Sequence, residues 1–185
     1  MIKAHPKTLD ISRTLLMVVD FQEAFRAVVN DFSTVASRIT LSVRCFQILD
    51  IPIIVTEQYP RGLGRTAEEI QLSLEPDTVI VEKTKFSAGR EPAVLDALNG
   101  KDQIVLCGLE THICVNQTAH DLLDQGLQVH LLTDCVASRF ERDKKVGLSK
   151  MFASGVIPSS VEMVLFEMMH DAKHPRFKEI QALVK

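Results

Sequence analysis

Short runs of apolar, β-branched residues recur along this chain, and helix-like stretches separate them. Five such runs are clear, and a sixth follows near the C-terminus: Leu15–Val19, Ile51–Thr56, Val79–Val81, Ile104–Cys107, Val129–Leu132 and Ile157–Val161. The first five are apolar at nearly every position. That pattern is typical of strands buried on both faces, as in a parallel sheet covered by helices.

Between these runs, apolar residues recur at spacings of three and four. The clearest case is Ser33–Leu49, which has one apolar stripe and Ser33 as its expected N-cap. Pro92 suits the first turn of another helix. Further helices are expected over 115–125, 141–154, 162–169 and 177–184. Strand–helix–strand repetition without a linker or shift in composition predicts a single three-layer α/β domain over 1–185.

Charge and hydropathy limit the partners that we expect. Net charge is −3, and the basic residues are scattered, so neither nucleic acid nor an anionic membrane is favoured. No apolar stretch is long enough to span a bilayer, and the N-terminus lacks the apolar segment of a secretory signal. We therefore expect a cytoplasmic protein; Lys3, Lys7 and Arg13 leave a mitochondrial location open.

In parallel α/β sheets, ligands bind outside the carboxyl ends of the strands, so the residues just after each run are candidates for chemistry. Asp20 ends the first run, where partial burial raises the pKa of a carboxyl group toward the range of a general base. As an alternative, Asp20 caps a helix or a turn. Lys83 ends the third run, and Asp20 could supply its counter-ion. Lys85 competes for the same role.

Four cysteines are dispersed along the chain without the spacing of a zinc site. Cys114 differs from the others because it follows the fourth run through a tight turn and begins the expected helix Cys114–Gln125. A helix N-terminus stabilises a thiolate, and its free N–H groups can form an oxyanion hole. We therefore expect the pKa of Cys114 to lie below the roughly 8.5 of a free cysteine. The alternative is a small buried core residue.

Five segments together resemble the isochorismatase-like superfamily of cysteine hydrolases, and the resemblance spans most of the chain. They occur in order: VVDFQEAF at 18–25, TEQYPRGLG at 56–64, EKTKFSA at 82–88, GLETHICV at 108–115 and TDCVASR at 133–139. The second segment and the C-terminal tail are most similar to the isochorismatase domain-containing branch.

The resemblance implies a Rossmann-like αβα fold with a six-stranded parallel sheet. It assigns Asp20, Lys83 and Cys114 as the catalytic trio, with the backbone N–H groups of Glu110 and Cys114 as oxyanion donors. It also implies a cis peptide between Leu109 and Glu110. The implied substrate pocket has its walls in four side chains, namely Phe25, Tyr59, Phe86 and His112.

The sequence departs from some family members at two places. Nicotinamidase-type members hold a metal through an aspartate and histidines after the second strand, whereas this chain has Glu57-Gln58-Tyr59-Pro60 there. We therefore expect no metal and no other cofactor. His112 stands where many amidase members have an aspartate, and we favour a structural or pocket-edge role over a Cys–His base.

These observations predict a hydrolase that cleaves an amide or ureido C–N bond of a small molecule through a thioester on Cys114. Two alternatives stay open. One is a vinyl-ether hydrolase of the isochorismatase type, which needs an acidic aspartate but no thiol. The other is a catalytically idle oligomeric scaffold. We also expect a homo-oligomer, because the apolar C-terminal helices could bury against a second subunit; alternatively, they cover their own sheet.

Overall fold

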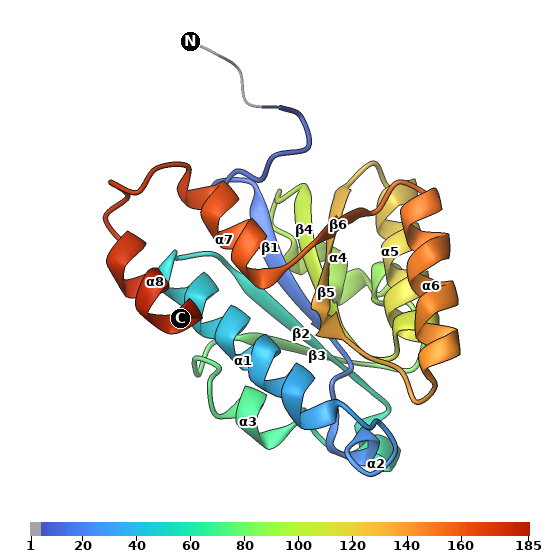
Figure 1. The fold of residues 1–185 in the computed structure, drawn as a ribbon. Helices are drawn as coiled ribbons and strands as arrows, with labels where there is room; N and C mark the ends of the chain where they lie inside the picture. The colour runs from blue at the N-terminus through green and yellow to red at the C-terminus, as the bar shows by residue number, and fades with distance from the viewer. Residues whose placement is uncertain (1–4) are drawn as a thin grey trace.

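The computed structural model describes residues 5–185, so Lys3 lies outside the described part. One parallel sheet organises the molecule (Figure 1). Its six strands are β1 (Thr14–Val19), β2 (Ile53–Gln58), β3 (Val79–Lys83), β4 (Gln103–Gly108), β5 (Gln128–Val136) and β6 (Ile157–Ser159). The strand order is β3-β2-β1-β4-β5-β6, which confirms the predicted six-stranded parallel α/β fold.

The helices form a layer on each face of the sheet (Figure 1). On one face lie α1 (Phe32–Ile48), α3 (Glu68–Gln71), α7 (Val161–Met169) and α8 (Phe177–Val184). On the other lie α4 (Pro92–Ala97), α5 (Asn116–Asp124) and α6 (Glu141–Ala153). Four short segments lie in the connections: η1 (Glu23–Phe25), α2 (Pro60–Leu63), η2 (Ala88–Arg90) and the π-helical turn η3 (Thr111–Val115).

The side chains of strand β1 are apolar on both faces of the sheet, so helices must cover both faces. Leu16 and Val18 pack into the core beneath α1 and α7, while Met17 and Val19 point into the core beneath α5. All six residues of the strand are buried. The strand order reverses between β1 and β4, and this switch point is where such folds bind ligands.

Two local expectations were wrong. Helix α1 begins at Phe32, after Asp31 and without a side-chain cap, so Ser33 is not its N-cap. Strand β3 is not buried on both faces, because it lies at the edge of the sheet and leaves Val79 and Ile80 partly exposed.

The C-terminal helices mainly cover their own sheet. Val164, Leu165 and Met168 of α7 and Ile180 of α8 are buried in the core that they share with α1. Among the described residues, no helix is long and apolar enough to cross a membrane.

Candidate active site

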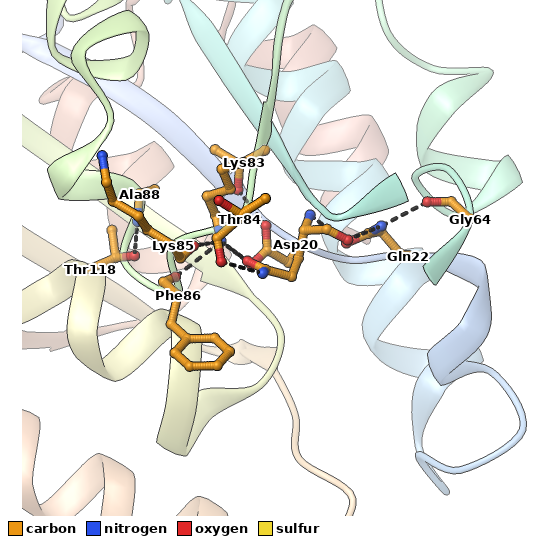
Figure 2. Close-up of polar contacts among 11 residues, drawn as sticks. Asp20, Gln22, Gly64, Lys83, Thr84, Lys85, Phe86, Ala88 and Thr118 are labelled. Atoms are coloured by element: carbon orange, nitrogen blue, oxygen red, sulfur yellow. Dashed lines mark hydrogen bonds and ion pairs between the residues drawn. The ribbon is translucent and has the colours of Figure 1, made fainter. Parts of the chain in front are cut away.

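Asp20 lies at the switch point, directly after β1, with a left-handed backbone (φ 49°). Such a conformation is uncommon for residues other than glycine, and aspartate tolerates it better than most. Both carboxylate oxygens have donors: Oδ1 accepts from Thr56 Oγ1 (2.7 Å), and Oδ2 accepts from Lys83 Nζ (2.6 Å). The ends of β1, β2 and β3 therefore meet at one buried carboxylate, as Figure 2 shows for Asp20 and Lys83.

The Lys83 ammonium group is enclosed by oxygen atoms. Besides Asp20, it donates to Gln58 Oε1 (2.8 Å) and to the backbone oxygens of Lys85 and Phe86 (3.0 Å each). An ammonium has only three N–H bonds for these four acceptors. The side chain of Lys85 lies elsewhere, with its Nζ on the backbone oxygen of Arg90 (2.9 Å). The structure thus brings Lys83, and not Lys85, to Asp20.

Cys114 faces the same carboxylate from η3. Hydrogen bonding to the thiol lowers the pKa of Asp20, as Lys83 and Thr56 also do, but burial outweighs them and raises it above its ordinary value. Burial and the negative charge of Asp20 raise the pKa of Cys114 to about 12, although Lys83 opposes them. The expected pKa below 8.5 is therefore wrong. Both pKa values are raised, so each group holds its proton more strongly than it would in water.

The turn that carries Cys114 begins at Gly108, whose φ is 123°. A Cβ atom there would lie 2.0 Å from the backbone oxygen of Val19, so β1 approaches too closely for any other residue. Residues 5–185 contain no cis peptide bond, so the expected cis bond between Leu109 and Glu110 is not present. The left-handed glycine turns the chain instead.

Cys114 does not begin helix α5, contrary to expectation. It lies inside η3, and α5 starts at Asn116. The N–H of Val115 reaches back to the oxygen of Glu110 (3.3 Å), a bond five residues long that widens the turn. Such π-type turns are frequent at functional sites. Among the described residues, the N–H groups of Glu110 and Cys114 form no backbone hydrogen bond to an acceptor outside this turn.

The turn is fastened to the segment that follows β5. The buried Glu110 carboxylate accepts from the backbone N–H of Arg139 (2.9 Å) and from its Nε (3.0 Å). Thr111 donates both its N–H and its hydroxyl to the oxygen of Ala137 (2.9 Å each). These bonds fix the turn from the side opposite Asp20.

The four expected pocket residues do not converge on one wall. Phe25 packs against the core beneath α1. Tyr59 is half-exposed and lines a cavity of about 400 Å³ next to Lys83. Phe86 is exposed, and its ring points away from the Asp20–Lys83 contact (Figure 2). His112 is half-buried, with Nδ1 3.0 Å from Ser138 Oγ.

Sequence reasoning assigned no role to three residues that support the site: Thr56, Gln58 and Gln22. Thr56 ends the expected strand Ile51–Thr56, and Gln58 lies just after it, where a neutral amide gives no sign of a catalytic role; Gln22 belongs to a loop. Glu57 is bound by Arg65 and Thr66, which makes it a structural carboxylate. Among residues 5–185, no group of three or more His, Cys, Asp or Glu side chains could hold a metal ion.

The six-stranded parallel sheet has a buried aspartate–lysine pair and a cysteine-bearing turn at its switch point, which together define a three-layer α/β protein with a candidate active site. The model of the isochorismatase domain matches residues 14–163. The chain is 43% identical to isochorismatase domain-containing protein 2 of Bos taurus, over 93% of this chain and 83% of that protein. The protein of that name from Danio rerio is 40% identical, over 95% and 89%. The chain therefore belongs to the isochorismatase domain family, as the sequence segments predicted.

Solved structures agree with this assignment. A structure described as the MAR1 ribonuclease of Caenorhabditis elegans superposes with a TM-score of 0.92 and 36% identity, over 96% of this chain and 92% of that one. The fold and the family are thus shown.

Proposed function

We propose that this isochorismatase-family protein is a cysteine-dependent hydrolase that cleaves a C–N bond in a small amide or ureide. One observation carries the proposal: the buried Asp20 carboxylate forms an ion pair with the Lys83 ammonium and lies close enough to the Cys114 thiol for each to shift the pKa of the other. A nucleophile beside a base that a third group holds in place is the arrangement expected for covalent catalysis.

The first half-reaction forms a thioester. As Cys114 Sγ attacks the substrate carbonyl carbon, Asp20 takes the thiol proton, because burial raises the pKa of both groups and a proton passed between them leaves no thiolate beside a carboxylate. The carbonyl oxygen becomes an oxyanion and accepts from the N–H groups of Glu110 and Cys114. The C–N bond then breaks, and protonated Asp20 gives its proton to the nitrogen, which leaves as ammonia or an amine.

The second half-reaction releases the acid. Asp20 takes a proton from water as the water oxygen attacks the thioester carbon, and the C–S bond breaks. The sulfur then recovers a proton from Asp20. Lys83 is given no proton-transfer role in this scheme, because its ammonium group is already bonded to oxygen atoms on all sides.

The test is a panel of small amides and ureides given to the purified chain, with ammonia release as the assay and intact-mass detection of an acyl adduct on Cys114. We expect turnover that Cys114→Ala and Asp20→Asn each abolish. A panel-wide absence of turnover would contradict the proposal.

The same panel separates the competing functions. The raised pKa of Asp20 also suits a proton donor to a vinyl ether, so hydrolysis of isochorismate that survives Cys114→Ala supports that reaction. RNA is included because of the activity named for the C. elegans protein. A chain that is inert toward all of these substrates supports a scaffold.

We also propose that the protein forms a homo-oligomer. Met163 and Phe166 on α7 stay exposed, although the buried residues of that helix, such as Val164 and Leu165, cover the sheet. Light scattering at micromolar concentration should give a mass above that of a 20.7 kDa chain; a monomeric mass would contradict the proposal.

A further inference from the structure

Gln58 ends β2 directly beside Lys83. The two residues are register partners on neighbouring parallel strands, so their side chains leave the sheet on the same side. Gln58 Oε1 accepts from Lys83 Nζ (2.8 Å), and Gln58 Nε2 donates to the backbone oxygen of Thr84 (2.8 Å). These opposite demands fix which amide atom faces the ammonium, and a carboxylate could not satisfy both.

The main chain of Gln58 is held as firmly as its side chain. Gln22, itself fully buried, accepts from the Gln58 N–H (2.8 Å) and donates to the Gln58 oxygen (3.0 Å) and to that of Gly64 (2.7 Å). The N–H of Gln22 in turn reaches the oxygen of Asp20 (2.9 Å). A closed ring of bonds therefore runs from Asp20 through Gln22 and Gln58 to Lys83 and back to Asp20; Figure 2 shows the Gln22–Gly64 bond, which branches from this ring.

Gln58 and Asp20 compete for one cation. Four oxygens share the three N–H bonds of Lys83, and only that of Asp20 carries a charge. We propose that Gln58 is a positioning residue that divides the Lys83 ammonium between a neutral amide oxygen and the Asp20 carboxylate, and so sets the proton affinity of Asp20 and of Cys114. This inference rests on the proposed roles of those two residues.

The ionisable groups around this point come from three segments. Asp20 follows β1, Lys83 ends β3, and Cys114 and Glu110 belong to the turn after β4, where the Glu110 charge also acts on the thiol. Other charges near Lys83 are Arg61, which lines the same cavity, and two sets of ion pairs: Glu57 and Glu82 with Arg65, and Lys85 with Glu91 (3.5 Å). A substitution at position 58 can therefore change the charge beside Lys83 while the surrounding ion pairs stay the same.

Two substitutions should act in opposite directions. Gln58→Glu places a second carboxylate on Lys83, which makes the ammonium less available to Asp20 and disfavours the thiolate. The pKa values of Asp20 and Cys114 should both rise, by about one unit. Gln58→Met removes the competing oxygen at similar volume, so both values should fall, by roughly half a unit. If Gln58 had a purely structural role, both substitutions would change the reactivity of Cys114 without shifting its pH dependence in opposite directions.

The experiment measures the rate of Cys114 alkylation by iodoacetamide between pH 6 and 11, with peptide mapping, in the full chain and the two variants. We expect the alkaline rise to move up in Gln58→Glu and down in Gln58→Met. Gln71→Glu, an exposed position on α3, adds the same charge far from the site and should change nothing. The inference is overturned if the alkaline rise in alkylation rate occurs at the same pH in all three proteins, or if it shifts in the same direction in both variants. If Gln58→Met does not fold, as judged by circular dichroism, the test rests on one comparison. The alkylation rate should then rise at a higher pH in Gln58→Glu than in Gln71→Glu, and the same pH in both would overturn the inference.

Alkylation needs no substrate, so this test stands apart from the proposed function. If hydrolysis is found, the acid limb of kcat/KM should shift in the same two directions. Hydrolysis with unmoved limbs would leave the function intact and contradict the role of Gln58. A shifted pH dependence of alkylation without any hydrolysis would support the role of Gln58 and contradict the proposed function.

Discussion

Lys83 Nζ and Asp20 Oδ2 lie 2.6 Å apart, and the two side chains are 0% and 1% exposed. Removing two charges from water costs several kcal/mol, and their attraction offsets that cost only where other hydrogen bonds satisfy both groups. Here the remaining acceptors of Lys83 and the hydroxyl of Thr56 do so. The pair is therefore best understood as a fixed part of the site, which makes the loss of one partner more costly than the loss of both.

Lys83→Met should destabilise the fold in a pH-dependent way. The pKa of Asp20 is already raised by burial, and loss of Lys83 would raise it further. A carboxyl group whose folded pKa is raised stabilises the fold below its unfolded pKa, and this stabilisation is lost as pH rises through the folded pKa. The deficit against the wild type should be small near pH 4 and about 3–5 kcal/mol near pH 8.

Urea unfolding at pH 4, 6 and 8 measures that deficit. Lys85→Met is the matched control, because Lys85 bonds only the backbone of Arg90 and, more distantly, Glu91. A deficit that is the same at every pH would show that Asp20 does not titrate with the loss of its partner.

Asp20→Asn should separate thiol reactivity from catalysis. The charge of Asp20 and its hydrogen bond both raise the pKa of Cys114, while Lys83 lowers it. With the carboxylate gone, the thiolate forms more easily, so iodoacetamide should label Cys114 faster than in the wild type at pH 9, by about tenfold for one pKa unit. Hydrolysis should nevertheless be lost, because no base remains. Slower labelling in this variant would contradict the assigned electrostatics.

Labelling should also be confined to one cysteine. Cys45, Cys107 and Cys135 are each 0% exposed, against 7% for Cys114. Burial raises the pKa of all four thiols, that of Cys45 to about 11 and that of Cys114 to about 12, so access to the reagent and not acidity distinguishes Cys114. Peptide mapping of the native protein should therefore find adducts on Cys114 only, and modification of Cys135 at a similar rate would show that the fold opens locally.

The sheet was predictable because its strands are continuous apolar runs, and Asp20 and Lys83 were identifiable as the polar residues that end two of them. The edge position of β3 was not, because an apolar run at the edge of a sheet has the same composition as one at its centre, although Val79 and Ile80 are exposed there. The thiol pKa was misjudged for a similar reason: the sequence shows a helix start, whereas the burial of Cys114 and the contact with Asp20 are tertiary.

Arg139→Ala should impair the reaction more than binding. Arg139 holds the buried Glu110 carboxylate, and the Glu110 N–H is one of the proposed oxyanion donors. We expect kcat to fall by roughly tenfold or more, as for a weakened oxyanion donor, with KM nearly unchanged. Arg142→Ala is the control, since Arg142 is exposed and pairs only with its neighbour Asp143. A rise in KM with unchanged kcat would assign Arg139 to substrate binding instead.

Gly108→Ala should prevent folding, because two costs coincide at this position. The backbone has a φ of 123°, and the added Cβ would meet the Val19 oxygen at 2.0 Å and its nitrogen at 2.7 Å. Neither atom can move without separating β1 from β4 at the switch point, so the loss should exceed about 4 kcal/mol. Gly126→Ala is the matched control: its φ is 80°, but nothing lies within 4 Å of the added atom. That variant should lose only about 1 kcal/mol, the cost of a left-handed alanine. Thermal unfolding of both proteins compares them, and a Gly108→Ala variant as stable as Gly126→Ala would mean that the two strands do not approach as closely as described.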